Sequence, residues 1–290
     1  MVKNILVTGD KGQLGNEIKV LSVDVNNCNF YFIDRDNLDI TDREALESFC
    51  KDKSIHIIIN CAAYTAVDQA ESDVETANEV NHLAVKTMAQ IAKKESIRLI
   101  HISTDYVFDG ENYRPYLEND VVNPQGVYGE TKLEGENAIL KENPEGAVII
   151  RTSWVYSSFG NNFVKTMLRL AKERDELGII FDQVGTPTYA KHLAETILHI
   201  VHNNTKAQES VEIYHYSNEG VCSWYDFAKA IFELSDITCK VNAIKTAQYP
   251  TPAKRPHYSV LDKEKIKSHY QTLEIPYWKD GLKECLSHLS

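Results

Sequence analysis

A tyrosine and a lysine, Tyr128 and Lys132, stand four residues apart in the stretch VYGETK. On a helix, side chains at positions i and i+4 lie on one face and within reach of each other. An ammonium group beside a phenol favours the phenolate, so we expect the pKa of Tyr128 to lie well below its usual value near ~10. The pair would serve as a tuned proton donor, although an exposed surface pair has the same spacing.

A glycine-rich turn near the N-terminus gives a second chemical signal. In VTGDKGQLGNEI, Gly9, Gly12 and Gly15 follow a strand-like run and open a helix. Glycines there permit a tight turn, close approach of the backbone to a pyrophosphate and close packing of helix on strand. We expect this turn, with Gln13 and Leu14, to bind a dinucleotide cofactor; an ordinary tight turn is the alternative.

The end of the second strand-like run bears on which cofactor is bound. Asp34 lies nineteen residues after Gly15, where an acidic residue commonly binds the ribose hydroxyls of a dinucleotide. Arg35 follows, and its guanidinium suits the 2′-phosphate of NADPH. Asp34 favours NADH and Arg35 favours NADPH, and we expect NADPH to be used, with NADH also accepted.

A hydroxyl side chain completes the set. STDYVF follows the fourth strand-like run, so Thr104 and Asp105 lie at the carboxyl edge of the predicted sheet, where open parallel sheets bind ligands. A hydroxyl, a tyrosine and a lysine above a nicotinamide form a carbonyl-reduction site. Thr104 would orient the oxygen, Tyr128 would protonate it, and Lys132 would tune the tyrosine and hold the nicotinamide ribose. Alternatively, Thr104 only caps the segment after the strand.

The elements that must position these residues follow from hydrophobic patterning. Runs rich in Ile and Val alternate with longer segments of helical periodicity, which predicts an α/β fold: a Rossmann-type, doubly wound parallel sheet with right-handed crossovers. We expect strands at 4–9, 30–34, 55–60, 97–103 and 146–153, with helices at 42–53, 73–95 and 130–142.

The later part of the chain is less regular. The proline-rich stretch 249–259 is expected to be extended or turning. Helices are expected at 161–176, 188–202 and 223–235, and strands at 178–181 and 211–216. These elements predict an NAD(P)-binding Rossmann domain of residues 1–156 and 182–208, and a smaller, discontinuous α/β substrate domain of residues 157–181 and 209–290.

Composition excludes several classes of protein. The chain is 43% hydrophobic and 25% charged, which is globular, and its net charge of −11 is unsuited to nucleic acid. No apolar run approaches the ~18 residues of a membrane-spanning helix, and the N-terminus has no signal-peptide pattern. The six cysteines and ten histidines lack metal-ligand spacing, so we expect reduced thiols in a cytoplasmic protein without a transition metal.

Longer stretches resemble the extended short-chain dehydrogenase/reductase family, in particular its nucleotide-sugar enzymes. The resemblance runs from the first strand to about residue 262 and rests on CAAYTAVDQAE, STDYVFDG, VYGETKLEGE, RTSWVY, GNNFVKTMLRLAKER and YPTPAKRPHYSVLD. It implies transfer of hydride from NADPH, or NADH, to C4 of dTDP-4-dehydro-L-rhamnose while Tyr128 protonates the oxygen. The product, dTDP-L-rhamnose, would supply cell-surface polysaccharide such as the O antigen of lipopolysaccharide.

The same resemblance implies further contacts. Those to the cofactor involve Ala62, Ala63 and Tyr64 after the third strand, Asp39 and Ile40 beside the adenine, and Asn81 supporting the lysine, unless Asn81 is an ordinary solvent-facing residue. Those to the substrate involve Val67, Thr104, Asp105, Tyr128 and Trp154, with Asn162 and Arg255 as candidates that a structural role would explain equally well.

One departure from the family concerns metal binding. Some members carry a magnesium site at a dimer contact, built from carboxylates on several segments, and Glu17 matches the first of these. Lys191 stands where such members have a glutamate, and the tail after Glu284 has no carboxylate side chain. Because a lysine repels a cation, we expect no metal here and a monomer or weak homodimer.

Two other functions keep the same scaffold. A nucleotide-sugar epimerase or dehydratase returns the hydride to the sugar; dehydratases need an Asp–Glu pair after the threonine, but here Asp105 is followed by Tyr106. Related proteins of this fold are also non-catalytic regulatory subunits. Such a subunit needs none of Thr104, Tyr128 and Lys132.

Overall fold

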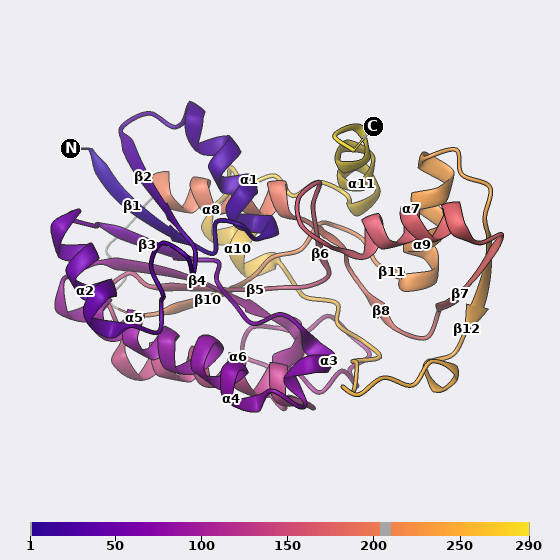
Figure 1. Cartoon of the computed structure of the whole chain (residues 1–290), viewed down its shortest axis with the longest axis horizontal. Coiled ribbons are helices and arrows are strands. Elements are labelled where there is room, and N and C mark those ends of the chain that lie inside the picture. Colours follow the sequence, from indigo (N-terminus) through magenta and orange to yellow (C-terminus); the bar gives the residue numbers. More distant parts are fainter. Residues whose placement is uncertain (1, 204–209, 290) are drawn as a thin grey trace.

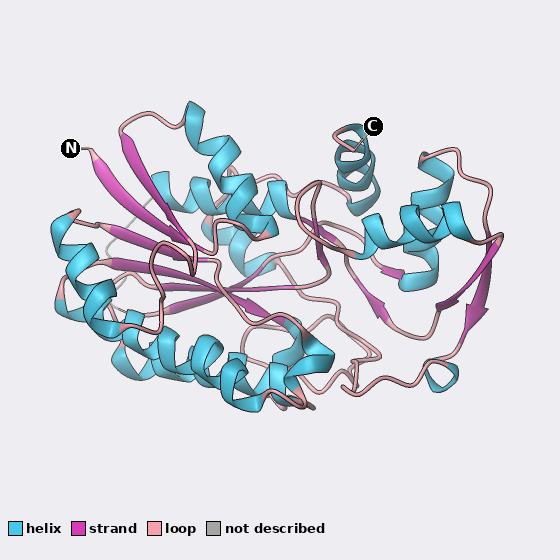
Figure 2. Ribbon diagram, viewed as in Figure 1, coloured by secondary structure: helices cyan, strands magenta, loops and turns pink. Residues whose placement is uncertain are grey.

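A parallel sheet with helices on both faces forms the larger part of the molecule (Figures 1 and 2). The computed structural model describes residues 2–203 and 210–289, and within them the sheet has six strands in the order β10-β5-β4-β3-β1-β2. Chain order reverses between β1 and β3, and this switch point is where doubly wound sheets bind ligands. The strands are β1 (Lys3–Thr8), β2 (Cys28–Ile33), β3 (Ile57–Asn60), β4 (Arg98–Thr104), β5 (Val148–Thr152) and β10 (Glu212–His215).

Alternate residues of each strand fill two separate cores. In β3, Ile57 and Ile59 pack toward one layer of helices, and Ile58 packs toward the other. The run is continuously apolar because both faces of the sheet are covered. One layer comprises α1 (Gln13–Leu21), α8 (Ala190–His202) and α10 (Glu264–His269), and the other comprises α2 (Arg43–Asp52), α5 (Ala84–Lys94) and α6 (Val127–Glu142). The predicted fold class is confirmed.

The helix predicted at 73–95 is one helical run with an internal irregularity. It consists of α4 (Val74–Asn78), the π-helical segment η2 (Glu79–Leu83) and α5, and the short helix α3 (Val67–Ala70) precedes it. Segments of π-helix inside α-helices are uncommon and frequently mark functional sites. Here the π turn lies beside the loop that follows β3.

A smaller part lies beyond the carboxyl edge of the sheet, at the right of Figure 1. Its core packs large side chains, including Tyr156, Phe227 and Trp278. Its helices are α7 (Phe163–Glu173), α9 (Trp224–Leu234) and α11 (Trp278–Ser287). In the described part of the chain the strand pairs are β6 (Val155–Tyr156) with β9 (Thr188–Tyr189), β7 (Glu176–Ile180) with β12 (Lys240–Ile244), and β8 (Val184–Gly185) with β11 (Cys222–Ser223).

Two later elements correct the expected division of the chain. The prediction assigned residues 209–290 to the substrate domain, but β10 pairs in parallel with β5 and forms the edge of the main sheet. Ile266 and Tyr270 pack in the same core as α1 and α8. The physical reason is that β5 exposes its outer edge and needs a partner strand. Residues 1, 204–209 and 290, which the division also assigned, lie outside the described residues.

Replacing Ile266 with alanine should destabilise the main sheet. The side chain is fully buried there, and such truncations cost roughly 2–5 kcal/mol. We expect amide hydrogen exchange to accelerate in β5 and β10, and less in α9 and α11. Leu282→Ala, which truncates a buried side chain of the smaller part, should give the reverse pattern. Faster exchange in α9 and α11 alone for Ile266→Ala would contradict the assignment.

Candidate active site

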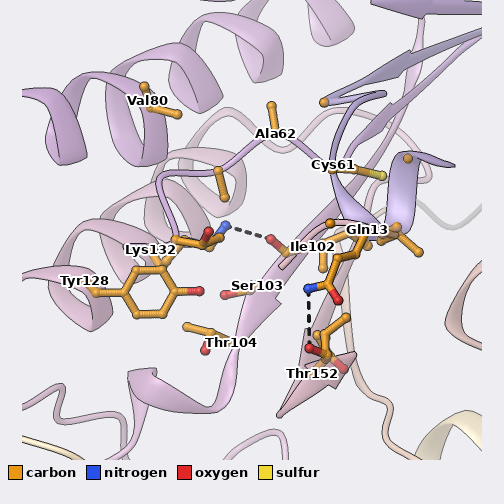
Figure 3. Close-up of a pocket in the computed structure, with 18 of the residues that line it drawn as sticks. Gln13, Cys61, Ala62, Val80, Ile102, Ser103, Thr104, Tyr128, Lys132 and Thr152 are labelled. Atoms are coloured by element: carbon orange, nitrogen blue, oxygen red, sulfur yellow. Dashed lines mark hydrogen bonds between the residues drawn. The ribbon is translucent and has the colours of Figure 1, made fainter. Parts of the chain in front are cut away.

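A cavity of about 980 Å³ lies at the carboxyl edge of the sheet and is lined from both parts of the molecule (Figure 3). Nearly all residues predicted to bind cofactor or substrate line it. They are Gly9, Gly12, Gln13, Leu14, Gly15, Asp34, Arg35, Asp39, Ile40, Ala62, Ala63, Val67, Thr104, Asp105, Tyr128, Lys132, Trp154, Asn162 and Arg255. The predicted residues Tyr64 and Asn81 are not among its lining residues.

The glycine turn fits the pyrophosphate of a dinucleotide. Gly9 has a φ of +70°, and a Cβ placed on Gly15 would lie 2.3 Å from the carbonyl oxygen of Gly9. Helix α1 therefore packs against the turn as only glycine permits. Among the described residues, Gly12 at the N-cap provides no side-chain cap, so the first N–H groups of α1 are available to an anion.

A lysine that was not predicted from the sequence, Lys11, strengthens the expected preference for NADPH over NADH. Lys11, within the glycine turn, forms ion pairs with Asp34 and Asp36. Hydrogen bonding to this ammonium lowers the pKa of Asp34. Arg35 is exposed nearby, and its Nε lies 3.8 Å from an oxygen of Asp39. Two cations at the ribose end of the site, with the Asp34 carboxylate already paired, favour a 2′-phosphate. The position of Lys11 between Gly9 and Gly12 is the sequence feature from which this role could have been predicted.

Helix α6 positions the tyrosine and the lysine. Its N-cap, Gly126, lacks a capping side chain, but Oε1 of the distant Glu71 accepts a hydrogen bond of 3.0 Å from the N–H of Val127. Tyr128 therefore lies in the first turn, and its phenol points toward Ser103 and Thr104 at the end of β4 (Figure 3). No local sequence pattern identified Glu71 as the cap.

The predicted lowering of the tyrosine pKa is wrong. Burial is the main effect that raises the pKa of Tyr128, the charge of Asp105 adds to it, and a hydrogen bond with Thr104 only partly opposes them; the pKa is about 12 as a result. The ammonium of Lys132 instead donates a hydrogen bond of 2.7 Å to the carbonyl oxygen of Ile102 (Figure 3). Loss of hydration penalises the phenolate more than a cation turned toward a strand carbonyl can compensate.

Lys132 and Asp105 have shifted pKa values with the same cause. Burial lowers the pKa of Lys132 to about 8, against the opposing charge of Glu136. Burial raises the pKa of Asp105 to about 6, although its Oδ1 accepts a hydrogen bond of 2.9 Å from the hydroxyl of Thr104. At neutral pH, Lys132 is therefore mostly cationic and Asp105 mostly ionised.

Two predicted cofactor contacts have another role in this structure. The Oδ1 of Asn81 accepts a hydrogen bond from the N–H of Tyr64, and its Nδ2 donates to the carbonyl of Tyr64 and to the hydroxyl of Thr131. Asn81 is buried and holds the loop after β3 against α6, so it is neither solvent-facing nor bonded to Lys132. The hydroxyl of Tyr64 donates to Asp73. Tyr64 and Asn81 thus support residues that line the cavity without lining it themselves.

A pair of stacked indoles, Trp154 and Trp224, lines the cavity. Trp154, which has a φ of +46°, stacks on Trp224 with 3.6 Å between ring centroids. Trp224 was not predicted because it lies seventy residues after Trp154, at the start of α9. The strained backbone of Trp154 is held by this stacking.

Two further substrate candidates make structural contacts. Asn162 caps α7 by accepting from the N–H of Lys165, and its amide donates to Oε1 of Gln13 at 2.9 Å. Arg255, which lines the cavity, forms a two-point ion pair with Asp68, with N···O distances of 2.9 and 2.6 Å. Asn162 thus joins the glycine turn to the smaller part of the molecule. The ion pair with Asp68 holds the guanidinium of Arg255 at the wall of the cavity.

The residues considered for a metal, Glu17, Lys191 and Glu284, each have a partner within the chain. Lys191 forms ion pairs with Glu284 and, at 3.8 Å, with Glu195. The hydroxyl of Ser157 donates to Oε1 of Glu17 at 2.6 Å, and burial raises the pKa of Glu17. The nearby Lys191 ammonium neutralises part of this acidic cluster, as a bound cation would.

A Rossmann sheet whose carboxyl edge gathers Thr104, Tyr128 and Lys132 beside a dinucleotide turn defines the short-chain dehydrogenase/reductase class. The chain belongs to the RmlD substrate binding domain family, whose model matches residues 3–290. The dTDP-4-dehydrorhamnose reductase of Aggregatibacter actinomycetemcomitans is 43% identical over 288 residues, which cover 96% of this chain and 97% of the relative.

Solved structures agree with this assignment. The dTDP-4-dehydrorhamnose reductase of Clostridium acetobutylicum is 43% identical, with a TM-score of 0.92 over 99% of both chains. That of Bacillus anthracis, in complex with NADP, is 36% identical, with a TM-score of 0.91 over 99% of both chains. The function implied by the sequence resemblance is thereby confirmed at the level of the family.

Removing the ammonium of Lys11 should reduce the preference for NADPH. In Lys11→Ala we expect roughly tenfold or greater loss of NADPH affinity, because a charge-assisted hydrogen bond contributes about 1.5–3 kcal/mol. NADH affinity should hold or improve, since Asp34 becomes free to bind ribose hydroxyls. Fluorescence titration with both cofactors measures this. Lys19→Ala, which removes an ion pair with Asp10 outside the cavity lining, is the control. Equal losses for both cofactors would refute the assignment.

Proposed function

We propose that this chain reduces the C4 ketone of dTDP-4-dehydro-L-rhamnose to dTDP-L-rhamnose with NADPH. The observation that carries the proposal is that Thr104, Tyr128 and Lys132 line one cavity together with the dinucleotide turn. Full-length relatives named dTDP-4-dehydrorhamnose reductase support the substrate, and the complex of one of them with NADP supports the cofactor.

The bound cofactor supplies a hydride, and the residues of the chain manage the proton. Tyr128 keeps its proton through the neutral range because burial raises its pKa to about 12. As negative charge develops on the former ketone oxygen, the phenol donates its proton to it. The cation of Lys132, held at the carbonyl of Ile102, stabilises the resulting phenolate.

Thr104 and Asp105 act on the same oxygen. Before substrate binds, the hydroxyl of Thr104 donates to Asp105 and accepts from the N–H of Tyr106. To polarise the ketone, this hydroxyl must turn from Asp105 to the substrate oxygen. The ionised Asp105 thus competes with the ketone for one proton, and the competition weakens as Asp105 protonates near pH 6.

The other end of the cavity suits a nucleoside diphosphate. The indole of Trp154 offers an aromatic face, and Arg255, which is paired with Asp68, brings a guanidinium to the lining of the same cavity. A pyrimidine base stacks on aromatic rings, and a diphosphate needs positive charge that a chain of net charge −11 must concentrate locally. Val67 and Asn162 also line the cavity.

The two alternatives have less support in the site. A dehydratase needs an acidic residue after Asp105, but Tyr106 is there, with its ring edge against Tyr128 at 5.4 Å between centroids. A regulatory subunit does not need a buried lysine at the end of the sheet, and burying such a cation is costly. Reduction of a ketone, by contrast, uses Thr104, Tyr128 and Lys132.

We also propose a cytoplasmic location, with a monomer or weak homodimer as the working form and no nucleic-acid or membrane partner. The six cysteines are free thiols, as expected where reduced nicotinamide cofactors are maintained. Across residues 2–203 and 210–289, no helix has both the length and the apolar character needed to cross a membrane.

An NADPH oxidation assay with dTDP-, UDP- and GDP-linked 4-dehydro-L-rhamnose tests the proposal. We expect one NADPH oxidised per product, with the dTDP sugar preferred. Tyr128→Phe should lower kcat by at least ~10²-fold because the proton donor is lost, while NADPH affinity stays within a few-fold. Catalytic rather than stoichiometric use of cofactor would favour the epimerase or dehydratase. Turnover surviving in Tyr128→Phe would refute the role of the tyrosine.

Magnesium should leave the oligomeric state of this protein unchanged, because Lys191 already pairs with Glu284. Gel filtration with and without magnesium measures this. Lys191→Glu places a carboxylate beside Glu284 and Glu17, and is the variant expected to gain magnesium sensitivity. A magnesium-dependent dimer of the unaltered protein would overturn the expectation.

A further inference from the structure

A histidine that the mechanism above does not use lies directly under the catalytic lysine. His101, on β4, is fully buried on the sheet face covered by α5 and α6, the face that also carries Leu99. An imidazole in such a core is destabilising unless its two nitrogens find partners. One partner, Asn60, belongs to a polar row across three strands, and the other is Lys132 on α6.

The strand register aligns this row. Thr8 lies opposite Asn60, and Asn60 lies opposite His101, so the three polar side chains occupy adjacent strands at one level of the sheet. The hydroxyl of Thr8 donates to Oδ1 of Asn60 at 2.6 Å. Nδ2 of Asn60 lies 3.0 Å from Nδ1 of His101, and Nε2 of His101 lies 3.4 Å from Nζ of Lys132.

The distances assign the protons in this row. A separation of 2.6 Å is typical of O–H···O and short for N–H···O, so Oδ1 of Asn60 faces Thr8 and the amide nitrogen faces His101. Nδ1 of His101 therefore accepts a hydrogen bond. Burial and the charge of Lys132 hold the pKa of His101 well below its usual value, so the ring is neutral and carries its one proton on Nε2.

This arrangement places a donor against Lys132. The ammonium of Lys132 has donors only, so it cannot accept a hydrogen bond from Nε2–H, and the two groups repel each other. The neutral amine has a lone pair and can accept this hydrogen bond. Apart from His101 on β4, the titratable groups that act on Lys132 are Glu136 on its own helix and Cys61 after β3. Glu136 and Cys61 favour the ammonium and burial favours the amine. The Nε2–H of His101, at 3.4 Å from Nζ, is a donor that adds to the effect of burial.

We propose that His101 is a positioning residue whose Nε2–H, fixed by Thr8 and Asn60, stabilises the neutral amine of Lys132 and so lets this lysine return a proton to Tyr128. The inference rests on the proposed reductase function. After each turnover, an N–H bond of the Lys132 ammonium breaks and the O–H bond of Tyr128 re-forms. The amine accepts the hydrogen bond from His101 until a solvent proton entering the cavity restores the ammonium.

The pH dependence of kcat tests this role. The alkaline limb should lie near pH 8, where Lys132 loses its proton, with activity present below and lost above. In His101→Phe, which removes the donor, we expect this limb to move up by about one pH unit, a tenfold change in proton affinity, and kcat at neutral pH to fall while the KM for NADPH changes little. His101→Gln, whose amide N–H reaches a similar position, should restore both values. A limb that stays in place, or moves to lower pH, would overturn the proposal.

Two measurements do not depend on the reaction. Nitrogen NMR of the unaltered protein with labelled histidine should identify Nε2 as the protonated nitrogen of His101; a proton on Nδ1 refutes the proposal even if the substrate assignment holds. If His101→Phe does not fold, Thr8→Val provides the test instead, because it removes the hydroxyl that fixes Asn60. It should shift the alkaline limb upward by a smaller amount, and no shift in a folded Thr8→Val enzyme would also contradict the proposal. Absence of turnover with the dTDP sugar, beside an Nε2–H tautomer, would instead disprove the reductase function.

Discussion

The site depends on one buried cation at the carboxyl edge of the sheet. Lys132 is 1% exposed, and its ammonium is held by the carbonyl of Ile102 at the end of β4. Burial of a charge disfavours the charged form, so the pKa of this lysine is lowered to about 8 from its usual ~10.4. Its neighbours either stabilise the ammonium, as the strand carbonyl and Glu136 do, or make the amine accessible, as His101 does.

Close backbone approaches bring the helix that carries this lysine to the sheet. A Cβ on Gly129 would lie 2.3 Å from the carbonyl oxygen of Tyr106, and one on Gly135 would lie 2.3 Å from that of Asn81. Helix α6 is therefore pressed against the segment after β4 and against the π turn η2. Any larger residue would lift Tyr128 and Lys132 away from the sheet edge. This explains why glycines interrupt a helix in which they otherwise reduce stability.

Sequence patterns were sufficient where the determining contacts are local. Strands β1 to β5 and the glycine turn are marked by runs and spacings within about a dozen residues, and the spacing of Tyr128 and Lys132 identified the chemistry. β10 was misassigned because its pairing with β5 depends on tertiary contacts. Glu71, Trp224 and His101 were missed for the same reason: each acts on a residue more than thirty positions away. The sign of the Tyr128 pKa shift was wrong because spacing reveals proximity but not burial.

The raised pKa of Tyr128 determines when the cation of Lys132 acts in the reaction. A phenol acidified in the resting enzyme would lose its proton before the hydride arrives, whereas Tyr128, with a pKa of about 12, keeps it. The alkoxide formed from the ketone is a stronger base than the phenolate, so transfer from Tyr128 is favourable once hydride has been delivered. The cation of Lys132 is then needed after the transfer, when the phenolate exists and is most unstable in its dry surroundings. Stabilisation specific to that state accelerates the reaction, and lowering the pKa of the resting phenol would not.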